Sequence, residues 1–200
     1  MIRILPMAAT ALTLLTFTAF AGDQYISVDK DGNMIVSGPF NAIIPKPAGA
    51  WTAGPMHSTP SFLDEQLKVS MAGYFAEAQF VTVQVETTDA GVGTLTNKNY
   101  PVRQIAGQEF RARDACIDIS QEELDADTDP TFEFIEDQGV KIVPAMQAVQ
   151  LVVVNEDGTA QGTILFMRNV PDGCETMSPE FKAEFDAAFE RFVGSIRAAN

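Results

Sequence analysis

The sequence predicts an α+β fold in which a central antiparallel sheet is covered by helices. Two observations indicate the sheet. Asp-Gly turns join short apolar runs into hairpins, and residues 80–86 alternate apolar with polar side chains at the two-residue period of a strand. A third observation indicates the helices: apolar residues recur every three or four positions in the middle and at the end of the chain. An antiparallel sheet is the natural cover for such helical stripes.

The first twenty-one residues have the pattern of a secretory signal peptide. Arg3 supplies a positive start, an apolar run extends to Phe20, and Ala19-Phe20-Ala21 is a small-x-small cleavage signature. We therefore expect a mature chain that begins near Gly22, a periplasmic or secreted location, and no membrane anchor after cleavage. Residues 22–200 suit a single globular domain.

The composition is strongly acidic. The chain has 13 Lys and Arg residues against 27 Asp and Glu residues, a formal net charge of −14, and loss of Arg3 with the signal peptide would make it −15. Such a charge repels nucleic acid and anionic membrane surfaces, so neither is an expected partner. The expected partner is a protein or a small ligand, which the composition does not identify.

Cys116 and Cys174 are the two cysteines of the chain. An exported protein folds in an oxidising compartment, where such a pair is expected to form a structural disulfide. The two residues are far apart in sequence and do not form a Cys-x-x-Cys redox unit. A chain with one histidine also offers few further ligands for a metal at these thiols.

The first half of the mature chain begins with a predicted hairpin. Tyr25 to Val36 contains two short apolar runs around the Asp31-Gly32 turn, and a further apolar segment from Phe40 ends at Pro45. Residues 47–60 are expected to form an irregular connection in which the single tryptophan, Trp51, covers an edge of the core.

Residues 61–78 are predicted to form a helix, because their apolar residues share one helical face. These apolar residues are Phe62, Leu63, Leu67, Met71, Tyr74 and Phe75. Residues 80–86 then alternate apolar and polar side chains, which predicts a half-buried strand.

The second half of the chain contains two predicted hairpins and a final helix. Residues 100–105 and 109–119 flank a Gly107 turn, with a bulge expected near Asp114 because the apolar residues change phase. Residues 149–154 and 160–167 flank an Asp-Gly turn. Ser178 and Pro179 predict the start of a helix. Its apolar stripe comprises Phe181, Phe185, Phe189, Phe192, Val193 and Ile196.

This last segment, FDAAFERFVGSIR, resembles the end of members of the Mog1/PsbP-like group. The similarity lies in Phe189 followed by Ser195-Ile196, after a strand pair such as 150–167, and the step from Ala106 to Arg111 is similar to the glycine-containing step into a central strand of that group. The resemblance implies an α/β/α sandwich and mostly non-enzymatic roles as assembly factors, adaptors and exported proteins. The cysteine pair and the acidic segment 122–137 depart from the pattern of the group.

That acidic segment contains the one set of residues with ligand-like spacing. Asp125, Asp127, Asp129 and Glu136 fall at the first, third, fifth and twelfth places of a twelve-residue calcium loop. The sixth place calls for glycine and holds Pro130, whose φ is locked near −65°. A solvated acidic loop is the competing interpretation. A calcium- or divalent-ion-responsive binding module is therefore the alternative function, and the main prediction includes no metal site.

His57-Ser58 suggests a third possibility, a secreted hydrolase. Adjacent residues seldom point at one another, however, and the chain has no Gly-x-Ser-x-Gly nucleophile elbow. Gly91 and Gly93 likewise lack the third glycine of a dinucleotide-binding fingerprint. The sequence therefore predicts an exported, non-enzymatic protein that acts by binding a protein or small ligand, with no catalytic residues and no cofactor.

Overall fold

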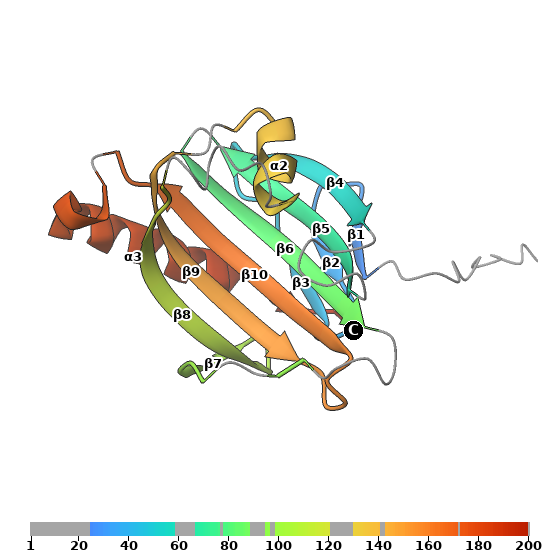
Figure 1. Cartoon of the computed structure of the whole chain (residues 1–200). Coiled ribbons are helices and arrows are strands. Elements are labelled where there is room, and N and C mark those ends of the chain that lie inside the picture. Colours follow the sequence, from blue (N-terminus) through green and yellow to red (C-terminus); the bar gives the residue numbers. More distant parts are fainter. Residues whose placement is uncertain are drawn as a thin grey trace, which may run out of the picture.

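The computed structural model describes residues 25–58, 67–76, 78–88, 95–96, 99–120, 130–140, 143–171 and 173–199. These residues form mostly antiparallel β-structure, arranged as one large and one small sheet (Figure 1). Helices α2 (Pro130–Asp137) and α3 (Pro179–Ser195) and the short 3-10 helix η1 (Cys174–Thr176) accompany the sheets in this part of the chain.

The large sheet has seven strands in the order β4-β5-β6-β10-β9-β8-β7. Their bounds are β4 (Trp51–Ser58), β5 (Leu67–Ala76), β6 (Gln79–Thr88), β7 (Val102–Ile105), β8 (Gln108–Asp118), β9 (Ala145–Val154) and β10 (Ala160–Asn169). The small sheet has the order β1-β2-β3-β11 and contains β1 (Ile26–Val28), β2 (Met34–Val36), β3 (Ala42–Ile44) and β11 (Arg197–Ala198).

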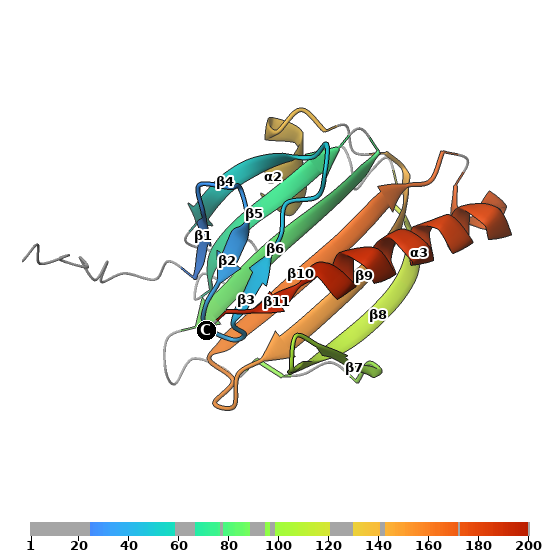
Figure 2. The ribbon, with the colours of Figure 1, turned by 180° about the vertical axis from the view of Figure 1, so that it is seen from behind.

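The two faces of the large sheet have different covers. Figure 2 shows α3 and the small sheet side by side on one face, whereas α2 lies against the opposite face in Figure 1. Strand β6 contributes to both layers, because Val81, Val83 and Val85 join the cluster under α3 and Phe80 joins the cluster under α2. This alternation is what a two-residue period requires of a strand that is buried on both faces.

The expected α/β/α sandwich is therefore wrong. Among the described residues, one face of the sheet is covered jointly by α3 and a second sheet, and the other carries the eight-residue helix α2. The error arose mainly from the predicted helix at residues 61–78, because residues 67–76 form strand β5 instead. Residues 61–66 lie outside the described part of the chain.

Strand β5 was mistaken for a helix because its residues from Val69 to Phe75 are all buried. Leu67, Met71 and Phe75 are four residues apart, and this spacing places side chains on one side of a strand as well as on one side of a helix. A strand that is buried on both faces has no polar positions that would show its two-residue period.

The expected irregular connection at 47–60 is also wrong in part, because residues 51–58 form β4. This strand lies at the edge of the large sheet, where a proline such as Pro55 is tolerated. Its pairing with β5 shifts register between Ala53 and Met56, which marks a bulge. Trp51 stacks on Phe75 at a ring-centroid distance of 4.7 Å, which confirms its predicted place over an edge of the core.

The predicted hairpins are confirmed. Residues 26–36 pair around Gly32, residues 145–169 pair around Gly158, and the turn between β7 and β8 places Ala106 and Gly107 at positive φ. The bulge expected near Asp114 is wrong, because β8 pairs with β9 in unbroken register from Arg111 to Asp118. The apolar residues change phase because Phe110 of β8 packs on the α3 side, whereas Ile119, directly after the strand, packs on the α2 side.

The predicted C-terminal helix is confirmed as α3. The Ser178 hydroxyl oxygen accepts a hydrogen bond from the Phe181 N–H at 3.1 Å, and Pro179 is the first helical residue. Phe185, Phe189 and Phe192 surround Phe166 of β10 at centroid distances of 5.4, 5.6 and 5.3 Å. Aromatic contacts of this kind add to the free energy gained from area burial alone.

Tyr74 joins the two sheets through two buried hydrogen bonds. The hydroxyl of Tyr74, in β5, accepts from the Met34 N–H at 2.7 Å and donates to the Ile44 carbonyl at 2.6 Å. Both partners belong to the small sheet. Burial raises the pKa of Tyr74 from 10.0 to about 12, because desolvation disfavours the phenolate.

We predict that Tyr74→Phe destabilises the protein by about 1–3 kcal/mol, because two buried backbone groups lose their partner. The tyrosine binds its proton more tightly in the folded state than in the unfolded state. Its contribution is therefore complete below pH 10 and is lost as the pH rises toward about 12. Urea unfolding at pH 8 to 11.5 should show a shallower alkaline decline for the variant.

The matched control for this prediction is Tyr100→Phe, because the Tyr100 hydroxyl has no hydrogen-bond partner among the described residues. This control should retain the wild-type stability and the wild-type alkaline decline. Equal stability of Tyr74→Phe and wild type at pH 8 would contradict the assigned role of Tyr74.

The predicted disulfide is present, with an S–S distance of 2.08 Å between Cys116 and Cys174. It joins β8 to η1, immediately before α3, across a sequence separation of 58 residues. The Cys174 N–H also donates to the Asp118 carboxylate at 3.2 Å. The start of α3 is thus tied to strand β8 of the large sheet.

We predict that Cys116→Ser/Cys174→Ser lowers the free energy of unfolding by up to about 4 kcal/mol, the chain-entropy value for a loop of this length. Urea unfolding with and without dithiothreitol measures the effect. The reductant should shift the wild-type midpoint and leave the double variant unchanged. A wild-type midpoint that does not respond to complete reduction would refute the prediction.

Candidate functional site

The calcium-loop residues are only partly within the described chain. Asp125, Asp127 and Asp129 lie outside it, and Glu136 is exposed on α2. Helix α2 begins at Pro130, so the last seven places of the proposed loop are helical. The described residues contain no group of three His, Cys, Asp or Glu side chains that could hold a metal ion. Calcium binding by this segment stays a prediction.

The hydrolase residues lie on the edge strand β4. His57 and Ser58 pair with Ser70 and Val69 of β5, and their own side chains are outside the described part of the structure. Gly91 and Gly93 are outside it as well. A secreted hydrolase therefore also stays a prediction.

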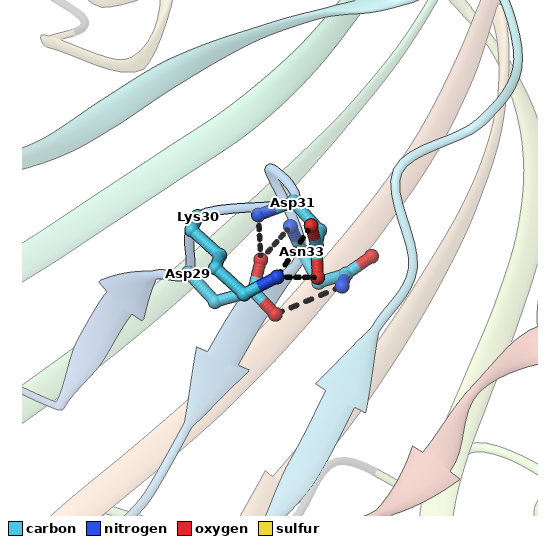
Figure 3. A network of polar contacts seen from close by, with 4 residues as sticks. All are labelled: Asp29, Lys30, Asp31 and Asn33. Atoms are coloured by element: carbon cyan, nitrogen blue, oxygen red, sulfur yellow. Dashed lines mark hydrogen bonds and ion pairs between the residues drawn. The ribbon is translucent and has the colours of Figure 1, made fainter.

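The hairpin turn between β1 and β2 carries a compact polar network (Figure 3). One carboxylate oxygen of Asp29 accepts from the N–H groups of Asp31 and Asn33 at 2.9 and 2.8 Å, and the other accepts from the Asn33 amide at 2.9 Å. The side-chain hydrogen bond from Asn33, followed by that from its backbone, lowers the pKa of the Asp29 carboxyl. These contacts use the carboxylate to hold the turn, so the network is structural.

Helix α3 is flanked by cavities on both sides. On one side, a cavity of about 630 Å³ lies between α3 and strands β7 and β8. We call it the paired groove, because most of its charged side chains have partners. They are Arg103, Arg113, Asp114, Asp186 and Glu190.

The pairing in this groove is extensive. Arg103 bonds Glu190 at 2.5 Å and lies over the Phe189 ring, while Lys182 contacts Asp114 at 2.9 Å and also Asp186. Burial lowers the pKa of Lys182, but hydrogen bonds from its ammonium to Asp186 and Asp114 outweigh burial and leave the pKa raised. A ligand ion would have to displace these partners.

On the other side of α3, two adjoining cavities of about 430 and 570 Å³ share Gln79, Ala188 and Arg191. We call them together the cationic groove. The first lobe lies between α3 and the segment after β3. Besides the shared residues, it is lined by Pro45, Lys46, Pro47, Ala48, Phe166, Phe192 and Ser195. The second lobe extends along α3 past Ala76, Ala78, Arg168, Glu184 and Ala187.

The charges of the cationic groove contrast with those of the whole protein. Lys46, Arg168 and Arg191 line it together with one carboxylate, Glu184, whereas the chain carries a net charge of −14. Arg168 lies 3.7 Å from Glu184 and over the Phe181 ring at 4.7 Å. Lys46 and Arg191 are exposed and have no carboxylate partner within the described ranges. The groove therefore holds two uncompensated positive charges.

Packing determines the shape of this groove. Phe166 and Phe192 are 1% and 7% exposed and form its floor as part of the aromatic cluster under α3. Pro45 and Pro47 also line the groove, and the Lys46 N–H donates to the side-chain oxygen of Asn33 at 3.2 Å. The groove thus follows from the packing of α3 beside the small sheet.

Sequence reasoning did not identify this groove. The sequence patterns single out neither Arg191 nor Lys46 as a ligand-binding residue. The available signal was an isolated lysine between two prolines in a chain with few basic residues. That signal does not reveal that Lys46 and Arg191, 145 positions apart, line one cavity.

Comparison with protein-family models, with curated proteins and with solved structures finds no match to this chain. The resemblance to the Mog1/PsbP-like group is thus a prediction that no comparison tests. Neither described helix combines the length and apolar character needed to cross a membrane.

Proposed function

We propose that this protein is an exported, non-enzymatic binding protein that holds a small anionic ligand in the cationic groove. The observation that carries the proposal is the presence of Lys46 and Arg191, both without a carboxylate partner among the described residues, in one cavity of an acidic protein. The Cys116–Cys174 disulfide supports export, because such bonds persist mainly in oxidising compartments.

The dimensions of the groove suit a small molecule. Each lobe falls within the range of about 300–1,000 Å³ that is typical of ligand pockets. The described surface offers little for a protein partner by comparison, because its large exposed apolar side chains are Trp51, Val102 and Ile117. Trp51 and Val102 belong to the opposite edge strands of the large sheet, so these side chains do not make one patch.

The chemistry of the groove favours binding over catalysis. Among the residues that line it, the hydroxyl of Ser195 donates to the Phe192 carbonyl at 2.6 Å, and the Glu184 carboxylate lies against Arg168. No histidine or cysteine lines either lobe. A nucleophile with an adjacent base, which covalent catalysis requires, is therefore lacking among the lining residues.

The two cations of the groove act on a ligand at shorter range than the net charge of the protein. The net negative charge of the protein repels anions at long range, and screening at physiological ionic strength limits that repulsion to about 8 Å. Within the groove, the two cations act on a ligand at closer range and beside an apolar floor. We therefore expect ligand affinity to depend on both Lys46 and Arg191.

We predict that at least one of benzoate, citrate, octanoate and phosphate raises the melting temperature of the wild type at low ionic strength, because a ligand of the native state stabilises it. Lys46→Glu/Arg191→Glu should weaken that binding at least tenfold. The matched control is Lys30→Glu/Arg197→Glu, which makes the same change in net charge at exposed positions outside the groove. If none of these anions binds to the wild type, the proposed function is refuted. It is also refuted if the anions bind equally well to the two double variants.

A further inference from the structure

We propose that the ligand of the cationic groove is an amphipathic monocarboxylate, with its carboxylate at Lys46 and Arg191 and an apolar body that extends along α3 over the second lobe. This inference rests on the proposed function and specifies the ligand class for the same site. It follows from the different character of the two lobes and from the two prolines that flank Lys46 at the charged end.

The first lobe provides the positive charge. Lys46 and Arg191 both line it, and no acidic residue is among its lining residues. Its remaining surface is largely apolar, because Pro45, Pro47, Phe166 and Phe192 surround the cations. A carboxylate can therefore contact two cations there while the carbon atoms next to it contact proline and phenylalanine rings.

The second lobe is closer to neutral and is lined by small side chains. Arg168 is compensated by Glu184 and lies over the Phe181 ring, while Ala76, Ala78, Ala187 and the shared Ala188 leave room along the helix. The two lobes share Gln79, Ala188 and Arg191, so one elongated molecule can occupy both. A second charged group would gain little in this lobe, whereas an apolar chain would bury surface against the alanines.

A compact dianion such as phosphate fits the first lobe less well than a monocarboxylate does. Phosphate sites commonly use free backbone N–H groups at a helix N-terminus or in a nest. Here Pro45 and Pro47 have no N–H, and the Lys46 N–H is bonded to Asn33. Arg191 also lies toward the C-terminal end of α3, where the helix dipole disfavours concentrated negative charge.

The test is isothermal titration of the full mature chain with four probes at low ionic strength: octanoate below its micelle concentration, acetate, octanol and inorganic phosphate. Octanoate should bind at least tenfold more tightly than each of the other three. The difference in binding free energy between octanoate and acetate measures the contribution of the apolar body. The difference between octanoate and octanol measures the contribution of the carboxylate.

Two exposed alanines of α3 provide a matched pair of variants. Ala187 lines the second lobe, whereas Ala183 is exposed on the same helix and lines none of the described cavities. Ala187→Gln should weaken octanoate binding at least threefold and leave acetate binding unchanged, because a neutral amide then lies where the apolar body binds and the charge at Arg191 is not altered. Ala183→Gln should leave the binding of both probes unchanged.

The outcomes separate this inference from the proposed function. If phosphate or acetate binds as tightly as octanoate, and Lys46→Glu/Arg191→Glu abolishes that binding, the ligand is not an amphipathic monocarboxylate. The proposed anion-binding function then still stands. Equal binding of octanol and octanoate, or equal effects of Ala187→Gln and Ala183→Gln, also shows that the proposed ligand class is wrong. If octanoate binds but is insensitive to Lys46→Glu/Arg191→Glu, or if no probe binds, both proposals fail.

Discussion

The packing of α3 around Phe166 is the interaction on which the rest of the structure depends. Three phenylalanines of α3 contact this one ring of β10, so the helix cannot rotate or slide without separating them. Both ends of the helix are also held, at the start by the Cys116–Cys174 disulfide and at the end by pairing of β11 with β3. The cavities on either side of α3 exist because its position is determined in this way.

The helix separates two surfaces of different electrostatic character. Lys182, Asp186 and Glu190 lie toward β7 and β8, where they form ion pairs, whereas Arg191 lies toward Pro45–Pro47 and has none within the described residues. Neighbouring residues of a helix point in different directions, so Glu190 and Arg191 can line different grooves. An acidic protein can thus present a localised positive site without changing its overall charge.

Local sequence patterns predicted the elements whose formation depends mainly on residues close together in the chain. The Asp-Gly hairpins, the Ser178-Pro179 helix start and the alternation at residues 80–86 each reflect backbone preferences over a few residues. Strands β4 and β5 were missed for a different reason. Residues of β5 are buried by both layers, and Pro55 is tolerated in β4 because that strand lies at the edge of the sheet. Burial on two faces and edge position are properties of the assembled sheet.

By itself, the sequence determined the acidic character of the protein, its hairpins, its amphipathic last helix and the single possible cysteine pair, because these follow from composition and from residues close together in the chain. Only the tertiary structure decided that a second sheet accompanies α3, and that Lys46 and Arg191 line one cavity. Their proximity depends on the pairing of β11 with β3 and on the packing of α3 against Phe166. Contacts between residues so far apart in the chain leave no periodic pattern in the sequence.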